Sequence, residues 1–207
     1  MATRRILQME QPDDLLRLKR KSSRVTSFDV ELARLVDDMV ETMRAADGVG
    51  LSAPQVGVLR RAVTMEMPGE YEEREDGAFE EIKPPELFML VNPEIVKIVD
   101  ERQPMLEGCL SLPGRYADVP RAPQVTIKYR DVRGKEHRLR ATDPLLAQCI
   151  QHEIDHLDGV LFTERIEDLT TLRDERRKPK RSRFRRPPRE QDAAGEAMLP
   201  EARAATG

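Results

Sequence analysis

Two histidines one helical turn apart are the residues of this sequence best suited to chemistry. His152 and His156 enclose the motif His-Glu-Ile-Asp-His, with Glu153 directly after the first histidine. On a helix, side chains four residues apart lie on one face, so both imidazoles can bind one metal ion. Glu153 then lies beside the ion, where a carboxylate can take a proton from a bound water. Only three histidines occur in 207 residues, which disfavours a chance pair in this pattern.

A catalytic metal site needs a third protein ligand and one open position. No histidine follows His156, whereas Cys109 lies upstream in the segment Glu-Gly-Cys-Leu-Ser-Leu-Pro. Its thiolate would complete a Cys–His–His site. Composition alone favours Cys109 as a small buried apolar residue, but the motif helix lacks a third ligand, and this favours ligation. Cys149 precedes His152 by three residues on the same helix, where a further ligand would crowd the ion. We therefore expect Cys149 to line a pocket beside the metal.

Two helices and several strands must position these residues. Apolar residues at helical spacing predict an amphipathic helix at 28–46, with Ser27 as its N-cap. The motif helix is predicted at 145–157, with Asp143 as N-cap, a proline in its first turn and Gly159 at its end. The remaining pattern predicts a glycine-rich loop at 48–57, strands at 61–67, 87–99, 125–130 and about 137–140, and a turn at Asn92-Pro93.

The composition excludes several classes of protein. Hydrophobic residues make up 39% and charged residues 35% of the chain, and no apolar run reaches the ~18–20 residues of a membrane helix. The first residues contain no apolar segment typical of a secretory signal. Two cysteines do not make a disulfide framework, so we expect a reducing, cytoplasmic location. Tryptophan is absent and aromatic residues total 4%, which disfavours stacking of nucleic-acid bases.

Charge is distributed unevenly along the chain. Residues 171–207 hold 11 Lys and Arg against 6 Asp and Glu, and ten of those basic residues lie within 173–189. We therefore predict a catalytic domain at 1–170 and a basic, disordered tail at 171–207. Residues 68–86 carry eight acidic and two basic residues and are expected to form an exposed loop.

Three blocks of sequence occur in a distinctive order. They are Gly-Val-Gly-Leu-Ser-Ala-Pro-Gln-Val-Gly at 48–57, Glu-Gly-Cys-Leu-Ser at 107–111 and Gln-His-Glu-Ile-Asp-His at 151–156. Each block alone is moderately specific, but together they resemble the peptide deformylases of bacteria. These metalloenzymes remove the formyl group from the N-terminal methionine of nascent proteins. The resemblance runs from about Leu7 to Ile166 and excludes the acidic segment and the tail.

The resemblance implies a role for each matching residue. The metal ligands would be Cys109, His152 and His156. Glu153 would be the catalytic acid and base, and the formyl oxygen would accept hydrogen bonds from the Gln55 side chain and the Leu110 N–H. The backbone of Gly50 would lie near the formyl group. The methionine pocket would be lined by Val49, Glu107 and Leu145, with Cys149 expected beside it. Two departures are Ser52, where the family usually has Ala, and Tyr116, in a segment where members carry Arg or Tyr.

The implied fold and reaction follow from the same resemblance. The fold would be α+β, with antiparallel sheets packed around a central helix that carries the histidines. Metal-bound water would attack the formyl carbon with Glu153 as base, and formate would leave. Fe²⁺ is implied as the native metal, and Zn²⁺, Ni²⁺ or Co²⁺ suit the same ligands. The substrates would be N-formylmethionyl peptides. For the basic tail two interpretations stay open, a solvated extension that aids solubility and a segment that contacts ribosomal RNA.

Other classes of function remain open on the residues alone. A metallopeptidase would use the same histidines and the same Glu153, and would draw its third ligand from Glu164 or Glu167 in place of Cys109. A metal-stabilised binding module would have four saturating ligands and no use for Glu153 or Gln55. A serine hydrolase is disfavoured, because the segment that begins at Gly50 lacks the final glycine of a nucleophile elbow.

Overall fold

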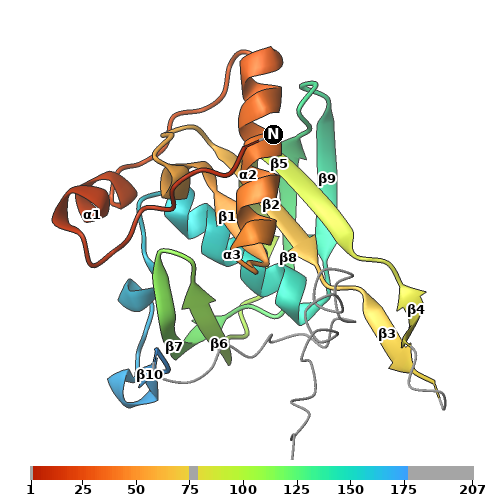
Figure 1. Cartoon of the computed structure of the whole chain (residues 1–207). Helices are drawn as coiled ribbons and strands as arrows, with labels where there is room; N and C mark the ends of the chain where they lie inside the picture. The colour runs from red at the N-terminus through yellow and green to blue at the C-terminus, as the bar shows by residue number, and fades with distance from the viewer. Residues whose placement is uncertain (1, 75–78, 177–207) are drawn as a thin grey trace, which may run out of the picture. The chain divides into compact units, whose positions relative to one another are not determined.

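The computed structural model of the protein describes residues 2–74 and 79–176. The chain forms two compact units. Of the described residues, the larger contains 2–68 and 85–176, and the smaller contains 69–74 and 79–84. The larger unit is built of helices and antiparallel sheets (Figure 1), as the α+β prediction requires.

A five-stranded sheet forms the centre of the larger unit, and all its neighbouring strands are antiparallel. In spatial order its strands are β1 (Gly50–Ser52), β2 (Ala62–Met67), β5 (Glu86–Ile98), β8 (Val125–Arg130) and β9 (Glu136–Ala141). The four strands predicted from the alternating pattern are therefore present. The short β1 comes from the glycine-rich loop, which continues as the 3-10 helix η1 (Ala53–Val56).

Both faces of this sheet are covered. In β2, Val63 and Met65 belong to the apolar cluster that contains Ile150 and Ile154 of helix α3 (Pro144–Leu157). Ala62, which directly precedes Val63, belongs to a second cluster with buried residues of helix α2 (Val30–Ala45). Because side chains alternate between the faces of a strand, α2 and α3 pack on opposite faces of the sheet.

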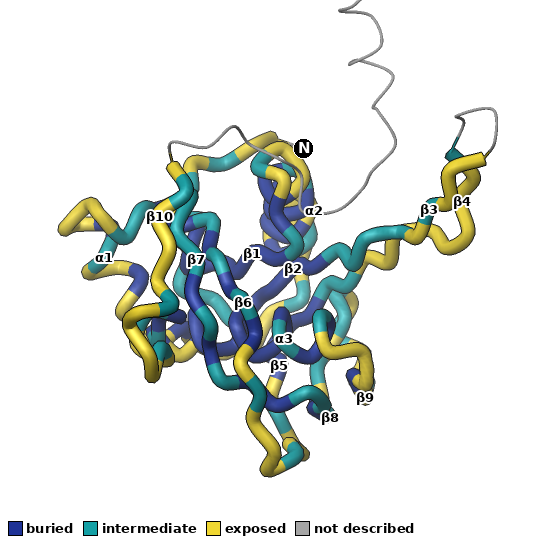
Figure 2. The backbone as a smooth tube through the Cα atoms, turned by 90° about the horizontal axis from the view of Figure 1, so that it is seen from below, coloured by how far each residue is buried: buried dark blue, intermediate teal, exposed yellow. Residues whose placement is uncertain are grey.

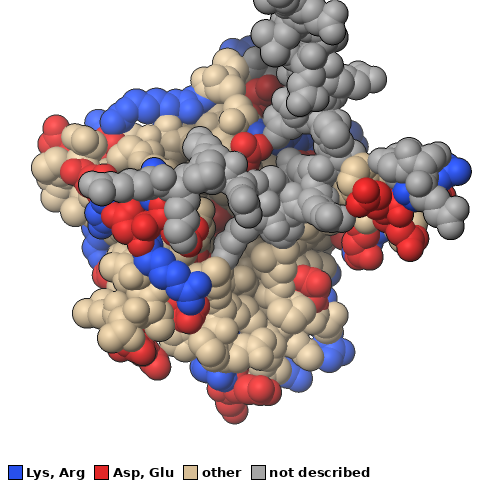
Figure 3. Space-filling view, turned by 60° about the horizontal axis from the view of Figure 1, so that its bottom comes forward, with Lys and Arg blue, Asp and Glu red and all other residues tan. Residues whose placement is uncertain are grey.

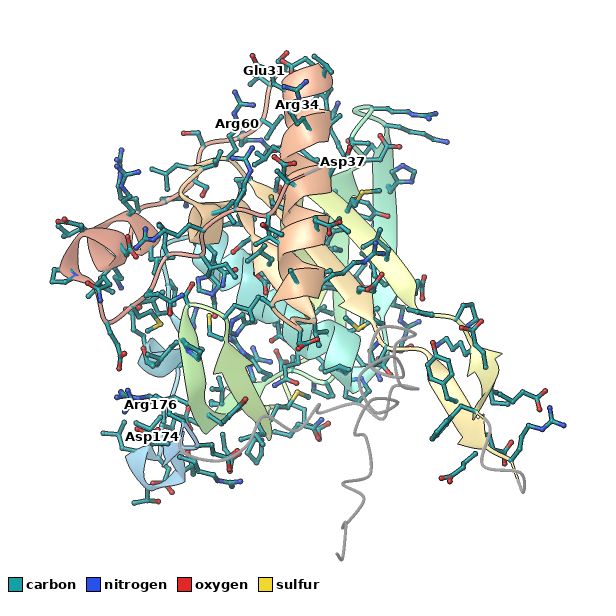
Figure 4. The ribbon with its side chains drawn as sticks, viewed as in Figure 1. Glu31, Arg34, Asp37, Arg60, Asp174 and Arg176 are labelled. Atoms are coloured by element: carbon teal, nitrogen blue, oxygen red, sulfur yellow. The ribbon has the colours of Figure 1, made fainter. Side chains whose placement is uncertain are left out.

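Helix α2 has the amphipathic character predicted for it, but its N-cap differs. Its apolar positions Leu32, Leu35, Val36, Met39, Val40 and Met43 are all buried. Its exposed face carries Glu31, Arg34 and Asp37 (Figure 4). The N-cap is Asp29, whose carboxylate accepts from the Leu32 N–H, and not Ser27. Ser27 donates its hydroxyl to the Asp29 carboxylate instead, so a carboxylate takes the position next to the positive end of the helix.

The predicted turn at Asn92-Pro93 is wrong, because β5 continues through these residues. The pairing of β5 with β8 shifts between Val91 and Glu94, which identifies an irregularity within one strand. Asn92 adopts φ 53°, a left-handed conformation that asparagine tolerates. Its buried side chain exchanges two hydrogen bonds of 2.8 Å with the backbone of Val25, so the loop before α2 is bound to the strand.

Helix α3 begins and ends as predicted. The Asp143 carboxylate accepts from the Leu146 N–H at 2.9 Å, and Pro144 occupies the first turn. Gly159 follows the helix with φ 75°, the left-handed conformation that ends many helices. Residues 149–157 of α3 are buried throughout, which makes this helix the most enclosed part of the structure (Figure 2).

A second, three-stranded sheet lies in the larger unit. Its spatial order is β10 (Arg173–Asp174), β7 (Leu112–Arg121) and β6 (Gln103–Cys109). Strands β6 and β7 form a tight hairpin whose last pair is Cys109 with Leu112. The remaining helices are α1 (Pro12–Leu18), η2 (Phe162–Glu164) and η3 (Leu169–Thr171). Helix α3 contacts the five-stranded sheet through the apolar cluster described above and the three-stranded sheet through the hydrogen bonds given below.

The acidic segment 68–86 forms strands rather than the predicted loop. The smaller unit is a hairpin of β3 (Glu70–Glu73) and β4 (Phe79–Lys83), paired in antiparallel fashion. Tyr71, Phe79 and Ile82 have high strand propensity, and two strands can pair without a core between them. The predicted exposure is present, and acidic side chains cover the hairpin (Figure 3).

The predicted domain boundary at 170–171 stays a prediction. Of the predicted tail, residues 171–176 are described and include β10, whereas 177–207 lie outside the described residues. Within the described part, no helix has the length and apolar character needed to cross a membrane.

Candidate metal centre and active site

The structure brings Cys109, His152 and His156 together as one group of possible metal ligands. One ligand atom from each residue lies within 4.8 Å of the other two, and all three residues are buried. The Cys109 Sγ lies 3.2 Å from His156 Nε2. A tetrahedral ion with bonds of about 2.0–2.3 Å separates its ligand atoms by about 3.3–3.6 Å, so the group has suitable dimensions.

Two elements supply these ligands. Cys109 is the last residue of β6, and the hairpin turn that follows directs its side chain toward α3. His152 and His156 are one turn apart on α3, and their rings lie 5.0 Å apart in a T-shaped arrangement. The ligand group therefore forms only because the end of β6 packs against helix α3 in the folded chain. The spacing of the three residues along the sequence does not bring them together.

Side-chain chemistry at the centre suits a divalent cation. Burial raises the pKa of the Cys109 thiol, but the charges and hydrogen bonds of His156 and His152 outweigh it and hold that pKa well below its ordinary value. Cys109 therefore favours the thiolate form, which is the form that binds metals. Among the described residues, His156 Nδ1 and Glu153 Oε2 are buried without a hydrogen-bond partner. A soft thiolate with two imidazoles fits zinc or another late divalent metal.

Glu107 orients His152. Its carboxylate lies 2.8 Å from His152 Nδ1, which leaves Nε2 as the nitrogen for a metal. The same carboxylate accepts from Arg121 at 2.7 and 3.2 Å. Burial would raise the pKa of Glu107, but the bonds from His152 and Arg121 lower it to about 2. The prediction that Glu107 lines the methionine pocket stays a prediction, because this carboxylate is directed at His152.

Arg121 links this carboxylate to a second one on the motif helix. Its guanidinium donates to Asp155 at 2.7 Å, and Arg165 also donates to Asp155 at 2.7 Å. Sequence analysis assigned no role to Arg121 or Asp155. The sequence did contain one indication. Glu107 and Cys109 are two residues apart in the chain, and on a strand such side chains lie on the same face, which places Glu107 near the ligand group. Two buried acidic residues near one helix then require a buried cation, and Arg121 supplies it.

The Gln55 side chain is held with its amide group toward the thiolate. Its Oε1 accepts from both the backbone N–H and the hydroxyl of Ser52, each at 2.8 Å. Its Nε2 consequently faces the centre and lies 3.5 Å from Cys109 Sγ and 3.3 Å from the Ser111 hydroxyl. Ser52, the departure from the usual Ala, therefore adds a bond that fixes Gln55.

Gly50 leaves space for Glu153. A Cβ at Gly50 would lie 2.5 Å from Glu153 Oε1 and 2.8 Å from Cys149 Sγ, so any larger residue would displace these groups. Burial is the main cause that raises the pKa of Glu153 above its ordinary value, which makes this carboxylate a better proton acceptor. Burial and the charge of Glu153 also raise the pKa of Cys149 well above its usual value, so this residue stays a neutral thiol.

The other predicted residues lie at the edge of this group. Val49 packs against the apolar cluster that contains Cys149, and half-buried Leu145 is one turn before Cys149 on α3. Leu110 lies in the turn directly after Cys109, and its carbonyl accepts from Gln8 at 3.3 Å. Within the described residues Glu164 is not part of the ligand group, because its carboxylate bonds Lys19 and the Leu161 N–H.

The fold and site define a class, an α+β protein with a buried Cys–His–His group beside an unpartnered glutamate. Comparison with known proteins then specifies the family. The family described as polypeptide deformylase matches residues 3–171, and the chain belongs to this family of enzymes. The peptide deformylase of Roseiflexus sp. is 51% identical over 174 residues, which cover 84% of this chain and 94% of that protein.

Solved structures agree with the sequence comparison. The crystal structure of a peptide deformylase from Legionella pneumophila is 40% identical and matches with a TM-score of 0.67, covering 82% of this chain and 89% of that one. The Ehrlichia chaffeensis peptide deformylase in complex with actinonin is 37% identical with a TM-score of 0.69, covering 83% and 92%. The family resemblance stated from the three sequence blocks is thereby confirmed.

Proposed function

We propose that this protein removes the formyl group from the N-terminal formylmethionine of nascent polypeptides and releases formate. One observation carries the proposal beyond family membership. The buried Cys109, His152 and His156 converge with suitable ligand spacing, and Glu153 keeps an unpartnered carboxylate oxygen on the same helix. A structural metal site would have no use for a buried carboxylate held without a hydrogen-bond partner.

Cys109, His152 and His156 would hold one divalent cation. When bound, the cation would lower the pKa of water and polarise the formyl carbonyl. Glu153 takes the proton from the attacking water and later delivers it to the leaving amine of methionine. Its raised pKa suits both steps, because a carboxyl that titrates nearer neutral pH can accept and then release a proton.

Gln55 and Leu110 would stabilise the negative charge that develops on the formyl oxygen. The Gln55 amide is preorganised by the two bonds from Ser52, so its N–H group need not reorient during the reaction. The Leu110 N–H belongs to the turn directly after Cys109 and supplies a second donor. Loss of one such donor costs ~2.7–4 kcal/mol of transition-state stabilisation in a comparable hydrolase.

The substrate class follows from the small space around the centre. Glu153 and Cys149 pack closely against the backbone of Gly50. Formyl is the smallest acyl group, so such close packing would admit it and exclude a larger group such as acetyl. Val49, Glu107, Leu145 and Cys149 would line an apolar pocket for the methionine side chain. Glu107 would contribute its backbone and Cβ to that pocket while its carboxylate orients His152.

Fe²⁺ is proposed as the native metal, with Zn²⁺, Ni²⁺ or Co²⁺ able to replace it. A thiolate with two imidazoles accepts each of these ions. Loading the anaerobically purified protein with each metal in turn, at one ion per chain, and comparing formate release would rank them.

The test of function is formate release from a formyl-Met tripeptide by the Fe²⁺-loaded protein. We expect formate release by the wild type and loss of this release in Glu153→Ala with metal content unchanged. The corresponding acetyl-Met peptide should stay intact, measured as the absence of acetate and of a free methionine amine. Glu164→Ala is the matched control, because it removes a glutamate outside the ligand group that a metallopeptidase would need. Loss of metal and of formate release in Glu164→Ala, with both kept in Cys109→Ala, would refute the proposed ligand set and favour a metallopeptidase, which would use the same Glu153 as its base.

We also propose that the protein acts in the cytoplasm, where its basic tail contacts ribosomal RNA. Ten Lys and Arg residues at 173–189 support this, since they can neutralise several phosphates in a salt-dependent way. Residues 177–207 lie outside the described residues. Deleting 172–207 should abolish co-sedimentation with ribosomes at low salt while formate release is retained. Unchanged co-sedimentation would refute this contact.

A further inference from the structure

The N-terminal residues 6–9, here called the N-terminal arm, join the two segments that carry the proposed oxyanion donors. The Leu7 N–H donates to the Gln55 carbonyl at 2.8 Å. The Met9 N–H donates to the Ser111 carbonyl at 2.8 Å, in the turn between β6 and β7. Gln8 lies between these two anchors, and nothing in the family resemblance assigns it a role.

The arm is held in place without the Gln8 side chain. In addition to the bonds of Leu7 and Met9, the Gln8 backbone N–H donates to the Asp14 carboxylate at 2.8 Å. The Leu7 side chain is buried in a cluster with Leu18 and Leu161. Three consecutive backbone N–H groups and one buried side chain therefore fix the arm, so the amide of Gln8 is available for another purpose.

That amide contacts the peptide unit that binds the thiolate. Gln8 Nε2 donates to the Leu110 carbonyl at 3.3 Å and to the Ile6 carbonyl at 3.1 Å. The N–H of the same peptide unit belongs to Ser111, and it donates to Cys109 Sγ at 3.4 Å. A hydrogen bond at a carbonyl polarises its peptide and strengthens the N–H on the other side. It also fixes the plane in which that N–H points.

We propose that Gln8 is a positioning residue that holds the Leu110–Ser111 peptide against the Cys109 thiolate. By fixing this turn, it also keeps the Leu110 N–H in place for the formyl oxygen, a part that rests on the proposed function. Gln8 acts on the site through the turn and contacts neither the ligand group nor the substrate.

A second glutamine offers a matched control. Gln148 Nε2 donates to the carbonyl of Leu106 in β6 at 3.1 Å. Like Gln8, it therefore donates a side-chain amide hydrogen bond to a backbone carbonyl near Cys109. The carbonyl of Leu106 belongs to a different peptide unit, whose N–H is that of Glu107. Replacing either glutamine with methionine keeps chain length and apolar contact and removes one amide bond. A merely structural role predicts the same outcome for both variants.

The experiment compares Gln8→Met and Gln148→Met by NMR and kinetics. In the zinc-loaded protein, which is diamagnetic, we expect the Ser111 amide proton to move upfield in Gln8→Met and to stay in place in Gln148→Met. With a formyl-Met peptide we expect kcat to fall about fivefold in Gln8→Met, the scale of one ordinary hydrogen bond, with KM unchanged. Gln148→Met should keep the wild-type kcat, and both variants should melt at similar temperatures.

Each contrary result has a definite meaning. An unmoved Ser111 amide in Gln8→Met, or equal effects in both variants, would overturn the positioning role. A shifted amide with unchanged kcat would overturn its importance for the reaction. If the wild type itself released no formate, the proposed function would fail, and the Ser111 shift would still decide whether Gln8 positions the turn.

Discussion

Replacing Arg121 with methionine tests whether the buried charges behind the metal centre depend on one cation. The Arg121 side chain is 6% exposed, and those of its partners Glu107 and Asp155 are 2% and 12% exposed. Breaking a buried ion pair by removing one partner costs about 3–5 kcal/mol, because the remaining charge stays out of water. Asp155 keeps a bond from Arg165 and Glu107 keeps His152, so we expect the lower end, about 3 kcal/mol.

This cost can be measured and compared with a close control. For a chain of this size, about 3 kcal/mol corresponds to a decrease in Tm of about 6–12 °C. Arg165→Met removes a bond to the same Asp155 from a side chain that is 47% exposed, and should cost about 0–1 kcal/mol. Guanidinium unfolding of metal-loaded wild type and both variants gives the two values directly. Equal losses would refute the reasoning that burial of the Glu107–Arg121 pair sets the cost.

The same substitution should weaken metal binding. Without Arg121, the Glu107 carboxylate loses the two hydrogen bonds that hold it in place and is less firmly directed at His152 Nδ1. Loss of such an outer hydrogen bond typically lowers metal affinity 10–100-fold. Competition with a chromophoric chelator measures the affinity for zinc. Arg165→Met is the control and should keep the wild-type affinity for zinc. The same wild-type affinity in Arg121→Met would contradict this prediction and show that the substitution affects stability alone.

Three further predictions follow from single contacts. In Asp14→Asn we expect a lower Tm than in the wild type near neutral pH, and the difference in Tm should narrow below about pH 4. The Arg5 hydrogen bond holds the pKa of Asp14 below its unfolded value of 3.8, so the stabilisation is lost as pH falls through the folded pKa. A difference in Tm that is independent of pH in thermal melts would contradict this. Gly50→Ala should lower kcat for formate release about 100-fold with metal content unchanged, because the new Cβ would displace the Glu153 carboxylate, and a wild-type kcat would refute that crowding. Cys109→Ala should lose its metal on dialysis against a chelator, measured by elemental analysis, and retention of one ion per chain would disprove the proposed ligand set.

Sequence patterns predicted the elements whose signals are local. Helix α3 was located because Asp143, Pro144 and Gly159 are strong end signals, and α2 because its apolar stripe is regular. The N-cap of α2 was misassigned, since Ser27 and Asp29 are both good caps and only the fold decides between them. Asn92 was misread as a turn because its left-handed conformation depends on bonds to Val25, which is distant in sequence.

The candidate site was only partly accessible to sequence. The two histidines follow from helical spacing. Cys109 was favoured only because the motif lacks a third ligand, and the family resemblance then supported that choice. Arg121 was missed because its partners lie 14 and 34 residues away in the chain. Gln8 was missed for the same reason, since Leu110 lies 102 residues away. Contacts between residues so far apart in sequence are set by tertiary packing, and they cannot be predicted from composition or periodicity.

The buried charged residues Glu107, Arg121 and Asp155 are explained better by function than by stability. Apolar residues of similar volume in place of a buried set of charges are often neutral or stabilising, because no charge then has to leave water. Replacing Glu107 with an apolar residue would nevertheless disturb the site. His152 needs a hydrogen-bond acceptor at Nδ1, which directs its Nε2 toward the ligand group. Once that carboxylate is buried, Arg121 becomes necessary to neutralise it, and Asp155 to accept from the rest of the guanidinium. The orientation of one imidazole thus accounts for three buried charged residues.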